Sequence, residues 1–265
     1  MLAVLGGARW KRDTAREIRK LATRAPAAPQ PAHYDRAEID SLPAPVVRYF
    51  EFALTQGQPL IEHARIEWKG QFSIRPRRWT PFSATQHYQM RPPGFVWDAR
   101  IRMTPGVPVL VRDTYIDHEG SLRAAIGGVV KVADHRGTPG IAVGELLRYL
   151  GEAVWYPTAL LPSAGLAWSA IDDSSATATL SDGATTVSID AHFGASAEIR
   201  SLSAMRPRDV KGESVLTPWV AHVGGYAVRS GMRVPTFGEA AWTLPTGPLP
   251  YWRGTLVDVH YSFAH

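Results

Sequence analysis

Alternation of apolar and polar residues dominates the middle of the chain and predicts β-strands. From Ala64 to Ile74 every second residue is apolar or glycine, and the residues between them are charged or polar. A period of two is typical of a strand with one buried face. The pattern recurs over Phe82–Met90 and Phe95–Met103, which the turn residues Pro92–Gly94 separate.

Short extended segments continue this pattern almost to the end of the chain. Glycine, proline, aspartate and serine separate them, as in hairpin connections. No segment repeats with a period of roughly 20–50 residues, which argues against propellers and solenoids. The further predicted strands are Val107–His118, Gly120–Leu122, Val129–Ala133, Leu166–Ile171, Ser175–Leu180, Ala184–Phe193, Ala197–Met205, Glu213–Val223, Phe237–Leu244 and Tyr251–Tyr261.

Two segments have the apolar spacing of amphipathic helices. One is Ala44–Leu54, and the other is Ile141–Trp155, which Pro157 ends. A long series of strands cannot stay flat and must curl. We therefore expect a mainly β fold: a large curved antiparallel sheet, half-barrel or barrel-like, with an N-terminal helix and with Ile141–Trp155 inserted as a helix across its concave side.

The N-terminal residues 1–24 predict a basic arm. Met1–Gly7 is apolar but far shorter than the about 20 residues that span a bilayer, and its cations follow it, unlike those of a secretory signal. Two interpretations stay open: the end of a membrane anchor with a positive cytoplasmic flank, or a solvated basic helix over Trp10–Leu21. Residues 25–43 are proline-rich and predict a linker, and residues 44–265 predict a single antiparallel β domain.

Charge and composition change this picture in one respect. Residues 1–24 carry seven cations and two carboxylates, and removing these from the 29 basic and 24 acidic residues leaves 22 of each. The β domain is thus neutral overall, which argues against nucleic-acid binding. The chain has no cysteine, which excludes disulfides, thiolate metal sites and a cysteine nucleophile.

The sequence lacks the common catalytic signatures, including the Gly-x-Ser-x-Gly elbow, nucleotide-binding glycine motifs and His-Glu-x-x-His. Its nine histidines have no spacing that directs two imidazoles at one metal. We therefore expect no metal and no cofactor, and the sequence leans away from an enzyme.

Charged and aromatic residues near the predicted helix are the candidate ligand-binding set. Asp98, Arg100 and Arg102 share one strand face, and Asp113, Tyr115 and Asp117 share a face of the next strand, so two carboxylates and two guanidinium groups could meet there to bind an anionic head group. The alternative is a solvated ladder of salt bridges. Tryptophans close to proline or glycine fill corners of the core or line a pocket. The predicted ligand-binding residues are Trp97, Asp98, Arg100, Tyr115, Arg148 and Trp155.

Three separated motifs together resemble a bacterial family known only as a domain of unknown function. They are the segments 92–103 (PPGFVWDARIRM), 144–160 with its Gly-Glu-Leu-Leu-Arg-Tyr-Leu start, and 250–254 (PYWRG), and the resemblance runs from Val46 to Tyr261. It implies no activity, cofactor or catalytic residue. Some members begin with a longer membrane helix, which this chain lacks.

Three functions follow as hypotheses. The first is binding of a hydrophobic or amphipathic small molecule, such as a lipid, in a tryptophan-lined concavity of a protein at the cytoplasmic face of the membrane, with membrane contact through residues 1–24. The second is a cofactor-independent enzyme that uses Glu145, Glu152, Asp98 or Asp113 beside Arg100 and Arg148. The third is a structural or interaction domain of a membrane-associated protein.

Overall fold

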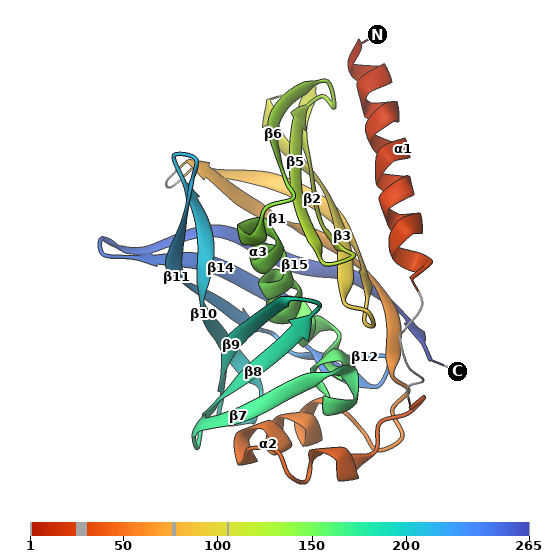
Figure 1. The fold of residues 1–265 in the computed structure, drawn as a ribbon, viewed down its shortest axis with the longest axis vertical. Helices are drawn as coiled ribbons and strands as arrows, with labels where there is room; N and C mark the ends of the chain where they lie inside the picture. The colour runs from red at the N-terminus through yellow and green to blue at the C-terminus, as the bar shows by residue number, and fades with distance from the viewer. Residues whose placement is uncertain (1, 25–30, 76–77, 105, 265) are drawn as a thin grey trace.

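A computed structural model describes residues 2–24, 31–75, 78–104 and 106–264 (Figure 1). The helices are α1 (Leu2–Ala22), α2 (Ala44–Ala53) and α3 (Pro139–Glu152), with short 3-10 turns at η1 (Arg36–Ile39), η2 (Ala153–Trp155), η3 (Pro157–Leu160) and η4 (Pro162–Ala164). The strands are β1 (Ile61–Arg75), β2 (Arg78–Gln89), β3 (Gly94–Thr104), β4 (Val107–Ile116), β5 (Glu119–Ile126), β6 (Val130–Arg136), β7 (Leu166–Asp172), β8 (Ser175–Asp182), β9 (Thr185–Phe193), β10 (Ile199–Val210), β11 (Glu213–Gly224), β12 (Ala227–Arg229), β13 (Met232–Val234), β14 (Phe237–Leu244) and β15 (Gly247–Phe263).

One antiparallel sheet of 13 strands forms the body of the protein, in the order β6-β5-β4-β3-β2-β1-β15-β14-β11-β10-β9-β8-β7. The first and last strands of the chain, β1 and β15, pair in its middle and join an N-terminal meander to a C-terminal one. The sheet curls strongly, and α3 connects its two edge strands across the concave side (Figure 1). The mainly β fold with one inserted helix is therefore confirmed.

The inserted helix starts at a sequence-encoded cap. Thr138 is extended, its hydroxyl accepts a hydrogen bond from the Ile141 amide, and Pro139 occupies the first turn. The helix then buries Leu146, Leu147 and Leu150 against the concave face. Helix α3 therefore fills the concave side of the sheet with a packed core.

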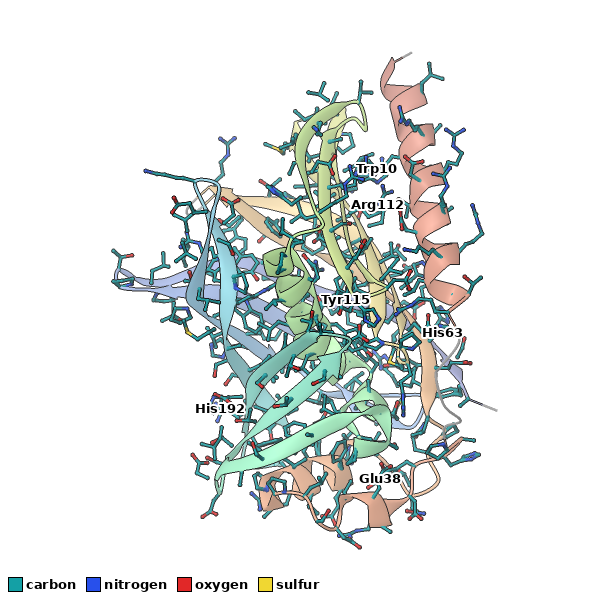
Figure 2. The ribbon with its side chains drawn as sticks, viewed as in Figure 1. Trp10, Glu38, His63, Arg112, Tyr115 and His192 are labelled. Carbon is teal, nitrogen blue, oxygen red and sulfur yellow. The ribbon has the colours of Figure 1, made fainter. Side chains whose placement is uncertain are left out.

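Helix α1 covers part of the opposite, convex face, which we call the outer face. It lies along β2, β3 and β4, and its Trp10 and Leu21 are buried. Figure 2 shows Trp10 beside Arg112 between the helix and the sheet, with the guanidinium 4.6 Å from the indole centroid. The predicted basic arm is thus an amphipathic helix that packs on the sheet. Within the described residues, no helix is long and apolar enough to cross a membrane.

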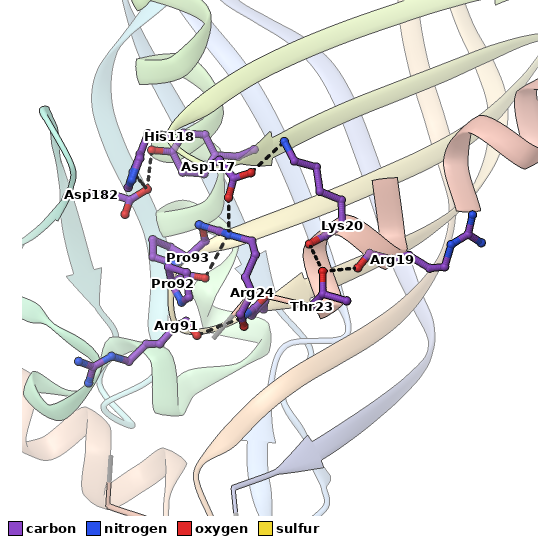
Figure 3. A network of polar contacts seen from close by, with 12 residues as sticks. Arg19, Lys20, Thr23, Arg24, Arg91, Pro92, Pro93, Asp117, His118 and Asp182 are labelled. Atoms are coloured by element: carbon purple, nitrogen blue, oxygen red, sulfur yellow. Dashed lines mark hydrogen bonds and ion pairs between the residues drawn. The ribbon is translucent and has the colours of Figure 1, made fainter. Parts of the chain in front are cut away.

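A polar network fixes the C-terminal end of α1 (Figure 3). Lys20 and Arg24 each lie 2.9 Å from a carboxylate oxygen of Asp117, in the β4–β5 turn. Arg24 also donates to the Pro93 carbonyl, and its own carbonyl accepts from Gln89. Residues 25–30 of the predicted linker lie outside the described residues. The rest of that linker contains η1, in which Asp35 caps the turn through the Ala37 amide.

Candidate functional site

The structure separates the predicted ligand-binding residues onto two faces of the sheet. Asp98 lies directly opposite Arg112, whereas Trp97 lies opposite Asp113. Residues directly opposite on antiparallel strands share a face. Asp98 and Arg100 are therefore on the outer face, and Trp97 and Asp113 are on the inner, concave face beneath α3. The expectation that Asp98 and Arg100 meet Asp113 and Tyr115 is wrong.

On the inner face, Arg148 of α3 is the centre of a buried charged cluster. Its Nη1 lies 2.5 Å from Asp113 Oδ2 and its Nε lies 2.9 Å from Glu152 Oε1. The second oxygen of Glu152 accepts hydrogen bonds from Gln86 and Tyr88, at 2.7 and 2.9 Å. The guanidinium also stacks on the Trp97 ring, 4.7 Å from its centroid.

Glu145 is the unusual member of this cluster. Its side chain is buried, and its Oε2 and the Oδ1 of Asp113 lack a hydrogen-bond partner among the described residues. Burial, and then the nearby Asp113 carboxylate, raise the pKa of Glu145 to about 8. Burial also raises the pKa of Asp113, although Arg148 opposes that rise. Glu145 thus stays protonated at neutral pH.

Charge counting supports a neutral Glu145. The cluster contains the carboxyl groups of Asp113, Glu145 and Glu152, and the cations Arg148 and Arg206 act on it. Full ionisation would leave one excess negative charge in a buried site, which is costly. One retained proton makes the group neutral.

The two remaining candidates belong to the core. Tyr115 is buried, and its hydroxyl donates to Asp182 at 2.9 Å. Trp155 is 4% exposed, donates to the Pro235 carbonyl and packs edge-on against Trp68, with centroids 4.8 Å apart. Trp97 is 2% exposed. Trp97 and Trp155 therefore fill the interior, which is one of the two roles expected for the tryptophans.

Beside the buried cluster, the inner face carries a row of arginines and aromatic rings that sequence reasoning missed, all partly exposed except the buried Trp219. We call it the arginine–aromatic row. Tyr251 stacks on Trp242 at 5.6 Å and meets Phe72 at 5.9 Å, and its hydroxyl accepts from Trp219. Its members are Phe72, Arg206, Arg208, Trp219, Trp242 and Tyr251.

Strand register brings the two arginines of this row to the inner face. On β10, Arg206 and Arg208 are two residues apart and point the same way. Arg206 donates to the Gly144 carbonyl of α3 and to the Tyr251 hydroxyl, and it lies over Trp219. Arg208 lies 5.7 Å from the Trp242 centroid. The strand predicted from the sequence ended at Met205, before both arginines. Alternation along β10 was therefore not used to place Arg206 and Arg208 on one face.

The described residues contain no group of three or more histidine, aspartate or glutamate side chains that could hold a metal ion. The inner face presents guanidinium groups, aromatic rings and the carboxyl groups of Asp113, Glu145 and Glu152.

Comparison with known proteins gives a family without an assigned function. No curated protein matches the chain. A solved structure with a similar fold is a LolA superfamily protein from Nitrosomonas europaea, with 9% sequence identity, a TM-score of 0.43, and coverage of 85% of this chain and 96% of that one. The model of a family of unknown function, DUF6544, matches residues 32–254, so the resemblance seen in the sequence is confirmed and the chain belongs to this family.

Proposed function

We propose that the arginine–aromatic row binds an anionic amphipathic small molecule, such as a fatty acid. The observation that carries this proposal is a pair of arginines without a direct ion pair. Among the described residues, no carboxylate oxygen lies within 4 Å of the guanidinium groups of Arg206 or Arg208. A guanidinium group is a strong bidentate partner for carboxylate and phosphate.

The rings beside these arginines supply the apolar half of the site. Phe72, Trp242 and Tyr251 are each only partly buried, and covering them with an alkyl chain removes apolar surface from water. A head group at Arg206 and Arg208 places the tail along this row. The proposed ligand thus lies across partly exposed rings and not in the expected concavity around Trp97 and Trp155.

The test compares laurate with dodecanol by calorimetric titration of the full chain. Dodecanol has the same tail and no charge. Replacing Arg206 and Arg208 with glutamine should weaken laurate binding at least about tenfold, because charged hydrogen bonds contribute about 1.5–3 kcal/mol each. Arg102→Gln with Arg229→Gln removes the same charge from exposed positions outside the row and should leave it unchanged. Undetectable laurate binding, or equal losses in both double variants, would refute the proposal.

A second candidate function, acid–base catalysis without a cofactor, has one supporting observation. Glu145 combines a pKa of about 8 with an unpartnered oxygen, the properties of a general acid near neutral pH. Arg206 joins it to the arginine–aromatic row through Gly144. If laurate binds, ester and thioester derivatives of laurate are the substrates to test. Glu145→Gln should then abolish turnover and preserve binding, whereas turnover unchanged in that variant excludes this role.

We also propose that the N-terminal end of α1 rests on an anionic membrane. Its outward side carries Arg9, Arg12, Arg16 and Arg19, all exposed. Next to this end, Val129 and Val130 at the β5–β6 turn are 51% and 59% exposed, and Leu5 is 60% exposed. Gly6 packs directly on this turn, since a Cβ there would come within 2.8 Å of the Gly127 carbonyl. Apolar tips beside cations suit an anionic bilayer surface.

Sedimentation with lipid vesicles tests this contact. The protein should bind phosphatidylcholine vesicles only when they contain phosphatidylglycerol. Val129→Asp with Val130→Asp should lower binding at least about tenfold, whereas Val228→Asp, at another position that is 59% exposed, should not. Equal losses in the two variants would refute the contact. A cytoplasmic location of the protein stays a prediction.

A further inference from the structure

A cleft on the outer face has the composition of an anion site. It has a volume of about 270 Å³ and lies between the N-terminal half of α1 and strands β1, β2 and β3. The inner face, with its arginine–aromatic row, is on the other side of the sheet. Gly7, Trp10 and Lys11 line the cleft from the helix, and Lys69, Ser83 and Arg100 line it from the sheet.

Strand register places the sheet residues of the cleft in one line. Lys69 of β1 lies opposite Ser83 of β2, and Ser83 lies opposite Arg100 of β3. Such directly opposite residues share a face. An ammonium, a hydroxyl and a guanidinium group therefore stand side by side across three strands, with the ammonium group of Lys11 contributed by the helix above them.

Two carboxylates also line the cleft, and each already has partners. Glu67 pairs with Arg65 at 2.5 Å. Asp98 accepts a hydrogen bond from the Trp10 indole at 2.7 Å and lies beside the buried Arg112, on the neighbouring strand. In contrast, Lys11, Lys69 and Arg100 have no carboxylate oxygen within 4 Å among the described residues. The local balance is therefore positive, with free cations directed at the cleft.

We propose that this cleft binds a phosphate ester group. Three cations from three elements, with a hydroxyl between two of them, provide donors on several sides of a tetrahedral dianion. The volume is slightly below the about 300 Å³ at which sites for drug-sized ligands begin. It suits a phosphate group with a small substituent, either as a soluble ester or as the head group of a lipid.

The first arm of the test uses glycerol 3-phosphate in solution, with binding followed by the NMR signal of the Trp10 indole N–H. Trp10→Phe identifies this signal. Lys69→Gln with Arg100→Gln should weaken binding at least about tenfold. Lys211→Gln with Arg229→Gln removes the same charge from exposed positions outside the cleft and should change affinity less than about threefold. Circular dichroism checks that both double variants fold.

The second arm uses phosphatidylcholine vesicles that contain phosphatidic acid. Glycerol 3-phosphate binding that depends on Lys69 and Arg100 identifies a site for soluble esters. Vesicle binding that depends on these two residues, without glycerol 3-phosphate binding, identifies a lipid head group. If both double variants lose the same affinity, the binding depends only on overall charge and the proposal is overturned. Failure of both probes to bind would also overturn it. Neither result bears on laurate binding, which uses the other face of the sheet.

Discussion

Replacing Glu145 with glutamine is expected to stabilise the protein at alkaline pH and to change little at acidic pH. The carboxyl group is buried beneath α3, and its pKa is raised from 4.5 to about 8. The folded protein therefore retains a proton that the unfolded chain releases between these values. The contribution of Glu145 to the free energy of unfolding is fully present below about pH 4.5. It falls as the pH rises and is lost above about pH 8.

The size of the effect follows from the same two pKa values. The slope is at most about 1.4 kcal/mol per pH unit for one proton, and the whole window corresponds to about 2–5 kcal/mol once relaxation of a buried site is allowed for. Glutamine has nearly the same shape as the protonated acid and does not ionise. The free energy of unfolding of Glu145→Gln should match that of the wild type near about pH 5 and exceed it by about 2–5 kcal/mol near about pH 9.

Urea unfolding followed by tryptophan fluorescence measures both proteins across this range. The two proteins are compared by the difference in their free energies of unfolding at each pH, because the titration of all other groups contributes equally to both and cancels. Glu119→Gln removes a charge at an exposed position and serves as the control. A difference that does not vary with pH, or a Glu145→Gln protein that is less stable at alkaline pH, would show that Glu145 is ionised and paired in the folded protein.

Three further predictions concern the packing of the two helices. Arg148→Met leaves Asp113 and Glu152 without their cation and should lower the free energy of unfolding by about 3–5 kcal/mol in urea titrations; a loss below about 1 kcal/mol contradicts the buried ion pairs. Trp10→Phe removes the donor to Asp98, which contributes about 1.5–3 kcal/mol, so limited trypsin digestion should cut α1 at least about tenfold faster while the sheet stays intact; an unchanged rate contradicts its docking role. Gly120→Ala would place a Cβ 2.5 Å from the Ile141 carbonyl of α3 and should destabilise the protein by about 1–3 kcal/mol, whereas Gly144→Ala meets open space in a helix and should stabilise it by about 0.5–1 kcal/mol in thermal unfolding; equal effects would contradict the close approach of β5 and α3.

The sequence predicted β1 and α3 well, because strand alternation or helix capping alone determines each of them. The alternation from Ala64 to Ile74 lies within β1, and the α3 segment begins two residues before the predicted start because Thr138 caps it and Pro139 fits its first turn. Each feature depends on neighbouring residues only. Local sequence therefore contains the information that fixes such an element.

Which residues share a face could not be predicted in the same way. The irregular pairing between Ile101 and Thr104, at the end of the β3–β4 ladder, sets the register that places Asp98 opposite Arg112. A shift by one residue moves every side chain to the other face. The next turn is at Asp117 and His118, which both have positive φ angles of 55° and 66°. Such turns favour Asn-Gly or Asp-Gly, so the predicted strand ran through them to His118.

The second difficulty is that β3 is covered on both faces. Val96 is 0% exposed beneath α1, and Trp97 is 2% exposed beneath α3. Alternation of apolar and polar residues identifies a strand that has one solvent-exposed face. It cannot show which residues bind a ligand when both faces of the strand are covered. Docking of α1 made Asp98 a partner of Trp10 in the interface instead of a ligand-binding carboxylate.

The distribution of charge explains why two proposed anion sites are consistent with a neutral β domain. On the inner face, Asp113 and Glu152 pair directly with Arg148, which leaves Arg206 and Arg208 without a direct ion pair beside partly exposed rings. On the outer face, Glu67 and Asp98 have their own partners, and the remaining cations line the cleft. Equal numbers of acids and bases thus conceal local positive groups, because the carboxylates are mostly used inside ion pairs. Net charge therefore does not reveal such groups, and only pairing in the folded protein shows which arginines and lysines remain free to hold a small anion.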